Sequence, residues 1–350
     1  MERQFDTDCE GPISKNDNAF EMAQFFLPEG DVFFAKISKY DDYLADILHK
    51  PGYKAGDTLR LILPFFRAYG VTELDIKDFS SRNVLIVPGA DSALKIILEE
   101  MPVFIISTSY RPYINSLCKA IGFPVENTYC TELAIDEYDI PDSEIQYLKS
   151  LYIEIMRLPD IEIPMSADLD DASIESIQRL DRIFWEEIPD MESGRLLTDI
   201  NPIGGFEKAN AIRDSCMKTG VQLSDVIYSG DSITDVEAMR LVSSAGGCAI
   251  SFNGNRYAIQ AADIACISPN ALILAVLALV FKEGVDLRSI ALEWDSERVV
   301  IQRMLESRFS EFSFEDIEIR LVDSCDKQDL IKRSEIFRKT IRGSHIGRLG

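Results

Sequence analysis

The sequence predicts an α/β protein with a three-layer, doubly wound parallel sheet and helical insertions. The main reason is a repeated alternation, because short apolar segments such as 103–106 and 226–228 are each followed by an amphipathic helical stretch. A second observation supports this class. Small groups of acidic, hydroxyl and lysine side chains follow several of these segments, and ligands bind at the carboxyl ends of strands in open parallel sheets.

The first part of the chain begins with a very short strand that ends near Asp6. Apolar residues then recur three and four positions apart over 16–79, which predicts helices interrupted at breaks that contain proline and glycine. The elements expected next are a helix that continues to residue 98, a strand at 103–106, a helix at 112–121 and a strand at 125–131.

The alternation resumes after an acidic interruption in the middle of the chain. The elements expected there are helices after Phe206, after Thr234 and at 257–262, and strands at 226–228, 248–250 and 264–266. Beyond residue 270 the chain is expected to be mostly helical.

These patterns divide the chain into a sheet core and three additions. The predicted parts are a core of residues 1–14, 84–135 and 200–282, a helical cap at 15–83, an acidic helical insertion at 136–199 and a C-terminal helical extension at 283–350. Residues 132–192 carry 18 acidic and 4 basic side chains. This composition favours a solvated helical hairpin, with a docking surface for a partner as the alternative.

The last 25 residues are basic, with seven Lys and Arg against three acids. We interpret them as counter-charge at a helix end or as a flexible end, rather than as a binding arm.

The overall charge excludes some partners. The 350 residues include 36 basic and 59 acidic side chains, a net charge of −23, which argues against nucleic acid or an anionic membrane as the main partner.

The longest apolar run, 271–281, is too short to span a bilayer, and we expect no membrane insertion. Seven scattered cysteines and two histidines argue against a zinc site. Without a signal-peptide pattern at the start, a cytoplasmic setting is expected.

Three carboxylates occur at alternate positions directly after the first strand, at Asp6, Asp8 and Glu10. Alternate residues of a strand share a face, so these side chains would converge if the strand continued. Carboxylates held close together repel each other, and a divalent cation relieves that repulsion. A Mg²⁺ site is therefore expected at this strand end.

Three further groups follow later in the chain. Ser107 and Thr108 follow an apolar strand and offer hydroxyl groups to a phosphate oxygen. Lys208 stands at the start of a helix, where it can reach a phosphate or balance a carboxylate. Asp231 and Asp235 form a second acidic pair on a tight turn after the strand at 226–228. Each group alone has an ordinary structural explanation, but their order and placement together indicate a site.

This order of carboxylates, hydroxyl, lysine and carboxylates resembles the four motifs of the haloacid dehalogenase-like hydrolase superfamily, in its phosphoserine phosphatase-like form. The segments 88–94 and 249–255 fit the same pattern. More narrowly, the segments 8–12 and 16–20 resemble an archaeal branch whose members are often labelled as energy-converting hydrogenase A subunit R. The resemblance implies a Rossmann-like core that carries helical caps.

The resemblance also implies a reaction and a set of roles. It implies Mg²⁺-dependent hydrolysis of a small phosphomonoester through an aspartyl-phosphate intermediate. Ser107 matches the motif hydroxyl and Lys208 the motif lysine. Asp231 matches the metal-ligating acid of the fourth motif, and Asp235 matches the residue that supports it. Asp235 is also a candidate metal ligand. Thr108 and Asn253 are placed near the substrate.

The first motif fits in two registers, which the sequence leaves open. In one, Asp6 is the nucleophile and Asp8 the acid/base residue. In the other, which we favour, Asp8 is the nucleophile and Glu10 the acid/base residue. Asp8 belongs to the site in both, and Asp8 and Glu10 are also candidates for metal ligands.

A rival hypothesis belongs to a different class of function. In it, the chain is a catalytically weak or inactive accessory subunit of an archaeal membrane hydrogenase. The glutamate at the acid/base position, the acidic insertion and the narrower resemblance favour this hypothesis. The expected partners are therefore a small phosphorylated substrate and either a hydrogenase complex or a second copy of the chain.

Overall fold

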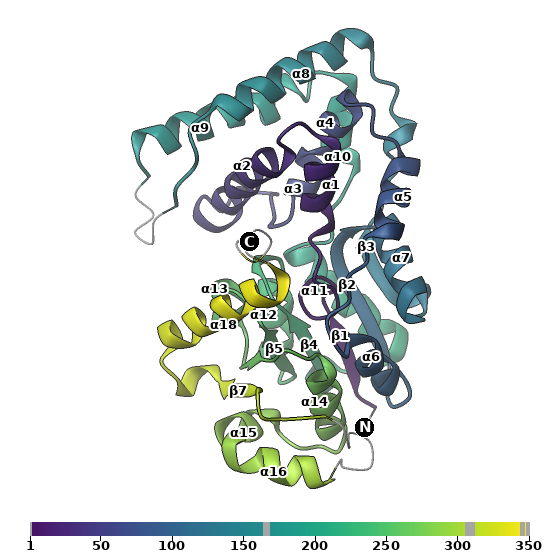
Figure 1. Ribbon diagram of the computed structural model, residues 1–350, viewed down its shortest axis with the longest axis vertical. Coiled ribbons are helices and arrows are strands. Elements are labelled where there is room, and N and C mark those ends of the chain that lie inside the picture. The colour runs from purple at the N-terminus through teal and green to yellow at the C-terminus, as the bar shows by residue number, and fades with distance from the viewer. Residues whose placement is uncertain (1, 164–168, 305–311, 344–346, 348–350) are drawn as a thin grey trace.

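The computed structural model describes residues 2–163, 169–304, 312–343 and 347 (Figure 1). Its centre is a seven-stranded sheet with the strand order β3-β2-β1-β4-β5-β6-β7, in which only β7 is antiparallel to its neighbour. The strands are β1 (Gln4–Thr7), β2 (Val103–Tyr110), β3 (Thr128–Thr131), β4 (Val226–Gly230), β5 (Cys248–Phe252), β6 (Ile264–Ile267) and β7 (Glu318–Leu321).

Helices cover both faces of this sheet, which confirms the predicted doubly wound α/β class. On one face, α6 (Ala90–Leu98), α7 (Arg111–Ile121) and α14 (Leu272–Lys282) enclose the larger part of the core. On the other face lie α11 (Phe206–Thr219) and α12 (Val236–Ser244). The apolar run near residue 275 belongs to α14, whose side chains are buried nearly all round, as expected for a helix inside a protein core.

The helices that interrupt the sheet core pack together as one helical body with a common apolar cluster. Phe33 contacts Tyr152 with ring centroids 4.5 Å apart, and Tyr40 stacks on Phe184, so the helical segments before and after residues 84–135 share one interior. The members are α1 (Asn18–Phe26), α2 (Gly30–Asp42), α3 (Thr58–Leu61), α4 (Leu63–Ala68), α5 (Glu73–Arg82), α8 (Asp142–Arg157), α9 (Asp171–Arg182) and α10 (Arg195–Asp199).

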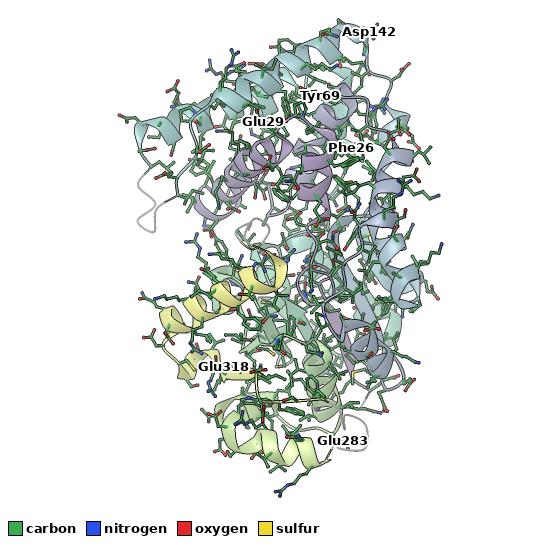
Figure 2. All side chains as sticks on the ribbon, viewed as in Figure 1. Phe26, Glu29, Tyr69, Asp142, Glu283 and Glu318 are labelled. Atoms are coloured by element: carbon green, nitrogen blue, oxygen red, sulfur yellow. The ribbon has the colours of Figure 1, made fainter. Side chains whose placement is uncertain are left out.

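The helical body lies over the carboxyl ends of the strands (Figure 1). Figure 2 shows Asp142, at the start of α8, and Glu283, just after α14, at opposite ends of the long axis of the molecule. None of the helices in the described ranges is long and apolar enough to cross a bilayer.

The C-terminal part contains a strand that the sequence pattern did not predict. Residues 318–321 were expected to be helical with the rest of this region, but they form β7, which pairs with β6 at the edge of the sheet. Only Ile319 of this strand is fully buried, and two of its four residues are charged. Such a short, charged segment has no apolar run to reveal it, so only the tertiary pairing defines it.

Helices α15 (Leu287–Leu292) and α16 (Trp294–Met304) precede β7, and α18 (Lys327–Arg342) follows it. Helix α18 packs on α13 (Arg256–Ala261) and runs from β7 toward the boundary between the sheet and the helical body (Figure 1). The end of the chain is thereby brought to the carboxyl edge of the sheet.

Candidate active site

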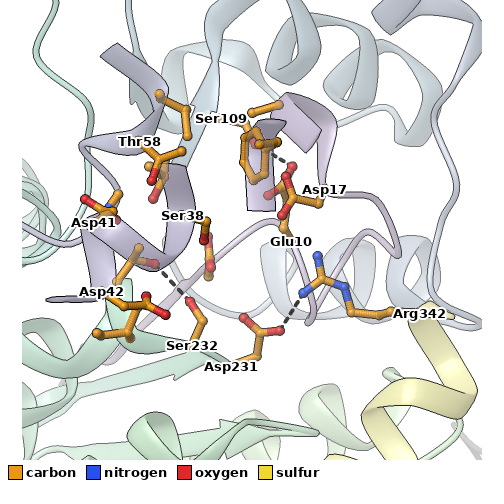
Figure 3. A pocket seen from close by; sticks show the side chains of 18 of the residues that line it. Glu10, Asp17, Ser38, Asp41, Asp42, Thr58, Ser109, Asp231, Ser232 and Arg342 are labelled. Atoms are coloured by element: carbon orange, nitrogen blue, oxygen red, sulfur yellow. Dashed lines mark hydrogen bonds and ion pairs between the residues drawn. The ribbon is translucent and has the colours of Figure 1, made fainter. Parts of the chain in front are cut away.

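The candidate site lies where β1 and β4 end side by side. The chain winds away from β1 in one direction and from β4 in the other, so the crevice between them is the topological switch point at which doubly wound proteins bind ligands. A cavity of about 100 Å³ occupies this place (Figure 3). The sheet edge contributes Asp8, Glu10, Thr108, Ser109, Asp231, Ser232 and Thr234, and the helical body contributes Asp17, Phe34, Ser38, Asp41, Asp42, Thr58 and Leu59.

Asp8 is the first residue beyond the β1 ladder, and its backbone N–H donates to Ser229 O at 2.8 Å. Its Oδ1 accepts the Cys9 N–H at 2.7 Å, while its Oδ2 pairs with Lys208 Nζ at 2.9 Å. Burial raises the pKa of Asp8 to about 7, helped by the charge of Asp235 and opposed by Lys208. The carboxylate is therefore fixed in place at the wall of the cavity.

Lys208 is fully buried in the first turn of α11. Its ammonium group bridges Asp8 and Asp235, at 2.9 and 2.7 Å. Burial alone would lower the pKa of a lysine, but the two carboxylates outweigh it and raise the Lys208 pKa above its ordinary value. The side chain is thus a permanent positive charge inside the site.

Asp235 organises the loop that follows β4. Its Oδ2 accepts the backbone N–H groups of Asp231 and Ser232 at 2.9 and 3.0 Å, and its Oδ1 accepts Lys208 and the Tyr228 hydroxyl, the latter at 2.6 Å. Lys208 and these hydrogen bonds lower the Asp235 pKa despite its burial. A Cβ at Gly230 would lie 2.4 Å from Asp235 Cγ, so only glycine fits beneath this carboxylate.

The carboxylates of Asp8, Asp231 and Asp235 offer oxygen atoms that all lie within 4.8 Å of one another. Both oxygens of Asp235 are already engaged, so Asp235 fits the supporting role rather than that of a ligand. Each oxygen of Asp235 accepts at least two hydrogen bonds, whereas Asp8 Oδ1 accepts one, and Asp231 Oδ1 forms no ion pair with the described residues. Carboxylate oxygens are the ligands that Mg²⁺ prefers, so the donor set fits this cation.

Glu10 lines the cavity two residues after Asp8. Its Oε1 accepts the Asn18 N–H at 2.8 Å and the Ser109 hydroxyl at 2.7 Å, and Glu10 is outside the group of potential metal ligands found among the described residues. Burial raises the pKa of Glu10 to about 8, with a further rise from Asp17. The raised pKa favours the protonated form of this cavity-lining side chain near neutral pH.

The hydroxyl groups of β2 are divided between the interior and the cavity. Ser107 is buried within the strand, where its Oγ accepts the Ser109 N–H at 3.1 Å. Thr108 and Ser109 form the cavity wall on this side. The Thr108 hydroxyl donates to Ile203 O at 3.1 Å and links β2 to the loop before α11.

Two predicted site residues lie elsewhere. Asp6 remains within the β1 ladder, buried against α11, where its carboxylate accepts hydrogen bonds from Gln4 Nε2 and from Ser215 Oγ. The placement favours the register with Asp8 as nucleophile, because the strand ends at Thr7 and Asp8, not Asp6, lines the cavity.

Asn253, which was predicted to lie near the substrate, forms hydrogen bonds with the backbone of Ser268. Its side-chain amide donates to Ser268 O at 2.8 Å and accepts the Ser268 N–H at 2.9 Å. Both polar ends are used to close the turn after β5, and Asn253 does not line the cavity.

Two arginines of α18 reach the site, and the sequence did not indicate them. Arg342 Nη1 pairs with Asp231 Oδ2 at 2.9 Å, and Arg338 Nη1 pairs with the same oxygen and with the Asp231 carbonyl, the latter at 3.1 Å. Both side chains are buried. Lys339 and Arg342 lie in the last turn of α18, in agreement with counter-charge at a helix end, but the interpretation missed the contacts of Arg338 and Arg342 with the site. The one available signal was the spacing of four between the arginines.

Fold and site together define a doubly wound α/β protein with a buried carboxylate–lysine centre beneath a helical body. No protein-family model and no curated protein matches the chain. The structure is similar to that of gene product AF1437 from Archaeoglobus fulgidus, with a TM-score of 0.82 and 29% identity, over 100% of this chain and 99% of that chain. It is also similar to phosphoserine phosphatase in apo form, with a TM-score of 0.44 and 12% identity, over 76% of this chain and 93% of that chain. The first similarity establishes the fold over the whole chain, and the second is too weak to carry an argument.

Proposed function

We propose that the protein is a Mg²⁺-dependent hydrolase of a small phosphomonoester and that Asp8 is its nucleophile. The observation that carries this proposal is the arrangement around Asp8. One carboxylate oxygen is held by the buried Lys208, and Glu10 faces the same cavity from two residues further on. This arrangement supplies a fixed nucleophile, a fixed positive charge and a proton donor in one enclosed space.

The reaction would proceed in two displacements at phosphorus. In the first, Asp8 Oδ1 attacks the phosphorus atom, the bond to the leaving oxygen breaks, and Glu10 gives that oxygen its proton. In the second, Glu10 accepts a proton from water, and the resulting hydroxide attacks the aspartyl-phosphate. Inorganic phosphate leaves and the Asp8 carboxylate is restored. Lys208 balances negative charge throughout.

Asp8 and Asp231 would hold the cation in this scheme. A bound Mg²⁺ supplies positive charge that reduces the repulsion between the Asp8 carboxylate and the phosphate oxygens. Asp235 keeps the loop of Asp231 in position through its two backbone hydrogen bonds.

The size of the cavity indicates a small substrate. The helical body closes over the sheet edge through very tight backbone contacts, because Gly56 and Gly204 meet there without intervening side chains. A cavity of about 100 Å³ leaves little room beyond a phosphate group and a short carbon skeleton. Closing the site in this way also excludes bulk water from the phosphoenzyme.

Substituting Gly204 by alanine tests the importance of this closure. A Cβ at Gly204 would lie 2.2 Å from the carbonyl oxygen of Ala55, so Gly204→Ala is expected to push the two bodies apart and lower turnover about tenfold or more, while costing roughly 1–3 kcal/mol of stability. The measurement is steady-state kinetics together with urea unfolding. Gly220→Ala is the control for turnover, because its Cβ meets nothing within 4 Å; its left-handed backbone (φ +77°) makes alanine cost stability there without pushing the two bodies apart. Full activity in Gly204→Ala would contradict the closed arrangement.

The proposed activity is tested by following phosphate release from a panel of small phosphomonoesters and an aryl phosphate, with Mg²⁺ and with a chelator. Turnover that requires Mg²⁺ is expected for at least one compound. Asp231→Asn is expected to lower that turnover by about 10²-fold or more, because the variant removes a ligand charge. Circular dichroism checks that the variant is folded. Unchanged metal-dependent turnover in Asp231→Asn would contradict the assignment of the cation site.

A second candidate function is an inactive accessory subunit of an archaeal membrane hydrogenase. The specific observation in its favour is that Arg338 and Arg342 form ion pairs with Asp231, the residue that would have to bind the cation in an active enzyme. If the protein copurifies with hydrogenase subunits and releases no phosphate from any compound of the panel, this second function is favoured over the first.

A further inference from the structure

Helix α18 presents an unusual stripe of buried residues to the rest of the protein. The stripe repeats every four residues and consists of Leu330, Ser334, Arg338 and Arg342. Only Leu330 is apolar, and it joins a small cluster under the first half of the helix. At the middle of the helix the Ser334 hydroxyl donates to Gly254 O at 2.6 Å, and the second half is held by the two arginines and by Phe337, which is partly buried against the same cluster. Burying two guanidinium groups is costly unless each is paired.

Both guanidinium groups are directed at one carboxylate. Asp231 Oδ2 accepts from Arg338 and from Arg342, as Figure 3 shows for Arg342. Arg342 also donates from Nε to Lys15 O at 3.2 Å and from Nη2 to Asn16 O, so it ties α18 to the loop that follows Glu10. The helix is thus fastened to the acidic loops after β4 and β1 together.

The ion pairs at Asp8, Asp231 and Asp235 contain as many positive as negative side chains. They join these three carboxylates with three cationic side chains, those of Lys208, Arg338 and Arg342. Four further carboxyl groups line the cavity beside them, those of Glu10, Asp17, Asp41 and Asp42. A divalent cation at Asp8 and Asp231 would lie beside two guanidinium groups on the same carboxylate, where like charges repel. Mg²⁺ also needs space for its bound waters, and the arginines line the small cavity that would have to hold them.

We propose that helix α18 competes with a divalent cation for Asp231, so that the cation binds only when Arg338 and Arg342 withdraw. The second half of the helix is the part that moves, since its buried side chains are two arginines and its apolar contact, Phe337, is only partly buried. The inference rests on the proposed function in one respect, because the competing cation is the one which that function requires. The helix is then a built-in block that keeps the site in a metal-free form.

The decisive experiment measures Mg²⁺ and Mn²⁺ binding by calorimetry, without substrate. Arg338→Met/Arg342→Met removes both competing charges and keeps side chains of similar length. Lys332→Met/Lys339→Met removes the same charge from the same helix without touching Asp231 and serves as the control. The arginine variant is expected to bind the cation at least tenfold more tightly than the wild type, whereas the lysine variant binds like the wild type. Equal or weaker binding in the arginine variant overturns the proposal.

A second measurement uses only the wild-type protein and does not depend on the variant being folded. Hydrogen exchange of the backbone amides of α18 is followed with and without Mg²⁺. Faster exchange in the second half of the helix, without a change in α11 or α12, is expected as the arginines leave Asp231. Unchanged or slower exchange in a protein that calorimetry shows to be metal-bound overturns the proposal.

The same data separate this inference from the proposed function. Equally tight binding by all three proteins, with metal-dependent phosphate release, removes the competition and leaves the hydrolase intact. Tighter binding in the arginine variant without phosphate release by any protein supports the competition and contradicts the hydrolase.

Discussion

Replacing Asp8 by asparagine is expected to lower metal-dependent phosphate release by at least about 10⁴-fold, which is typical of removing a nucleophile that forms a covalent intermediate. An amide oxygen is a far weaker nucleophile than a carboxylate, and the asparagine side chain would keep nearly the same shape beside Lys208. The measurement is turnover of the best compound of the panel with saturating Mg²⁺.

Asp6→Asn is the matched control for this prediction. It makes the same kind of carboxylate-to-amide change two residues earlier, but the Asp6 side chain bonds Gln4 and Ser215 away from the cavity. Turnover within a few-fold of the wild type is expected for Asp6→Asn. A large loss in Asp6→Asn with little loss in Asp8→Asn would reverse the assignment of the nucleophile.

Lys208→Met is expected to be the most destabilising of the substitutions considered, because it leaves two buried carboxylates without their shared counter-charge. Breaking a buried ion pair from one side costs about 3–5 kcal/mol, and Lys208 serves two such pairs. Turnover should fall by at least about 10²–10³-fold in any protein that remains folded. Urea unfolding and steady-state kinetics measure the two effects.

Lys218→Met provides the control on the same helix. Lys218 pairs with Asp214 and lies half-exposed at the other end of α11, so its loss should cost less than about 1 kcal/mol. Comparable stability of the two variants would contradict the view that Lys208 holds the centre of the site together.

The sequence was sufficient to bring the central residues together, and the reason is physical. In a parallel sheet all carboxyl ends lie at one edge, so polar residues that follow separate strands must meet there. Asp8 and Asp235 follow neighbouring strands, and the start of α11 places Lys208 between them. This part of the site could therefore be predicted without knowing how the side chains pack.

The register of the first motif required the structure. Asp6 and Asp8 are both aspartates, and their side chains would point to the same face of a strand. What distinguishes them is that β1 ends at Thr7, so Asp6 lies within the strand and Asp8 beyond it. Their partners, Ser215 and Lys208, stand seven residues apart on one helix, and nothing local in the sequence assigns either partner.

The contribution of α18 was also hidden from the sequence. Arg338 and Arg342 lie more than 100 residues from Asp231, on a helix whose polar composition resembles that of a solvated surface helix. Periodicity reveals buried stripes when they are apolar, and this stripe is mostly polar. Tertiary ion pairs, rather than hydrophobic pattern, determine its place.

The central claim is that Asp8 carries the phosphoryl group during turnover. The most direct test is to quench the reacting protein in acid, trap the acyl-phosphate by reduction with borohydride and locate the modified residue by peptide mass spectrometry. Modification of Asp8 is expected in the wild type, with none in Asp8→Asn. Modification at Asp6 or at another residue, or metal-dependent turnover with Asp8 unmodified throughout, would contradict the account.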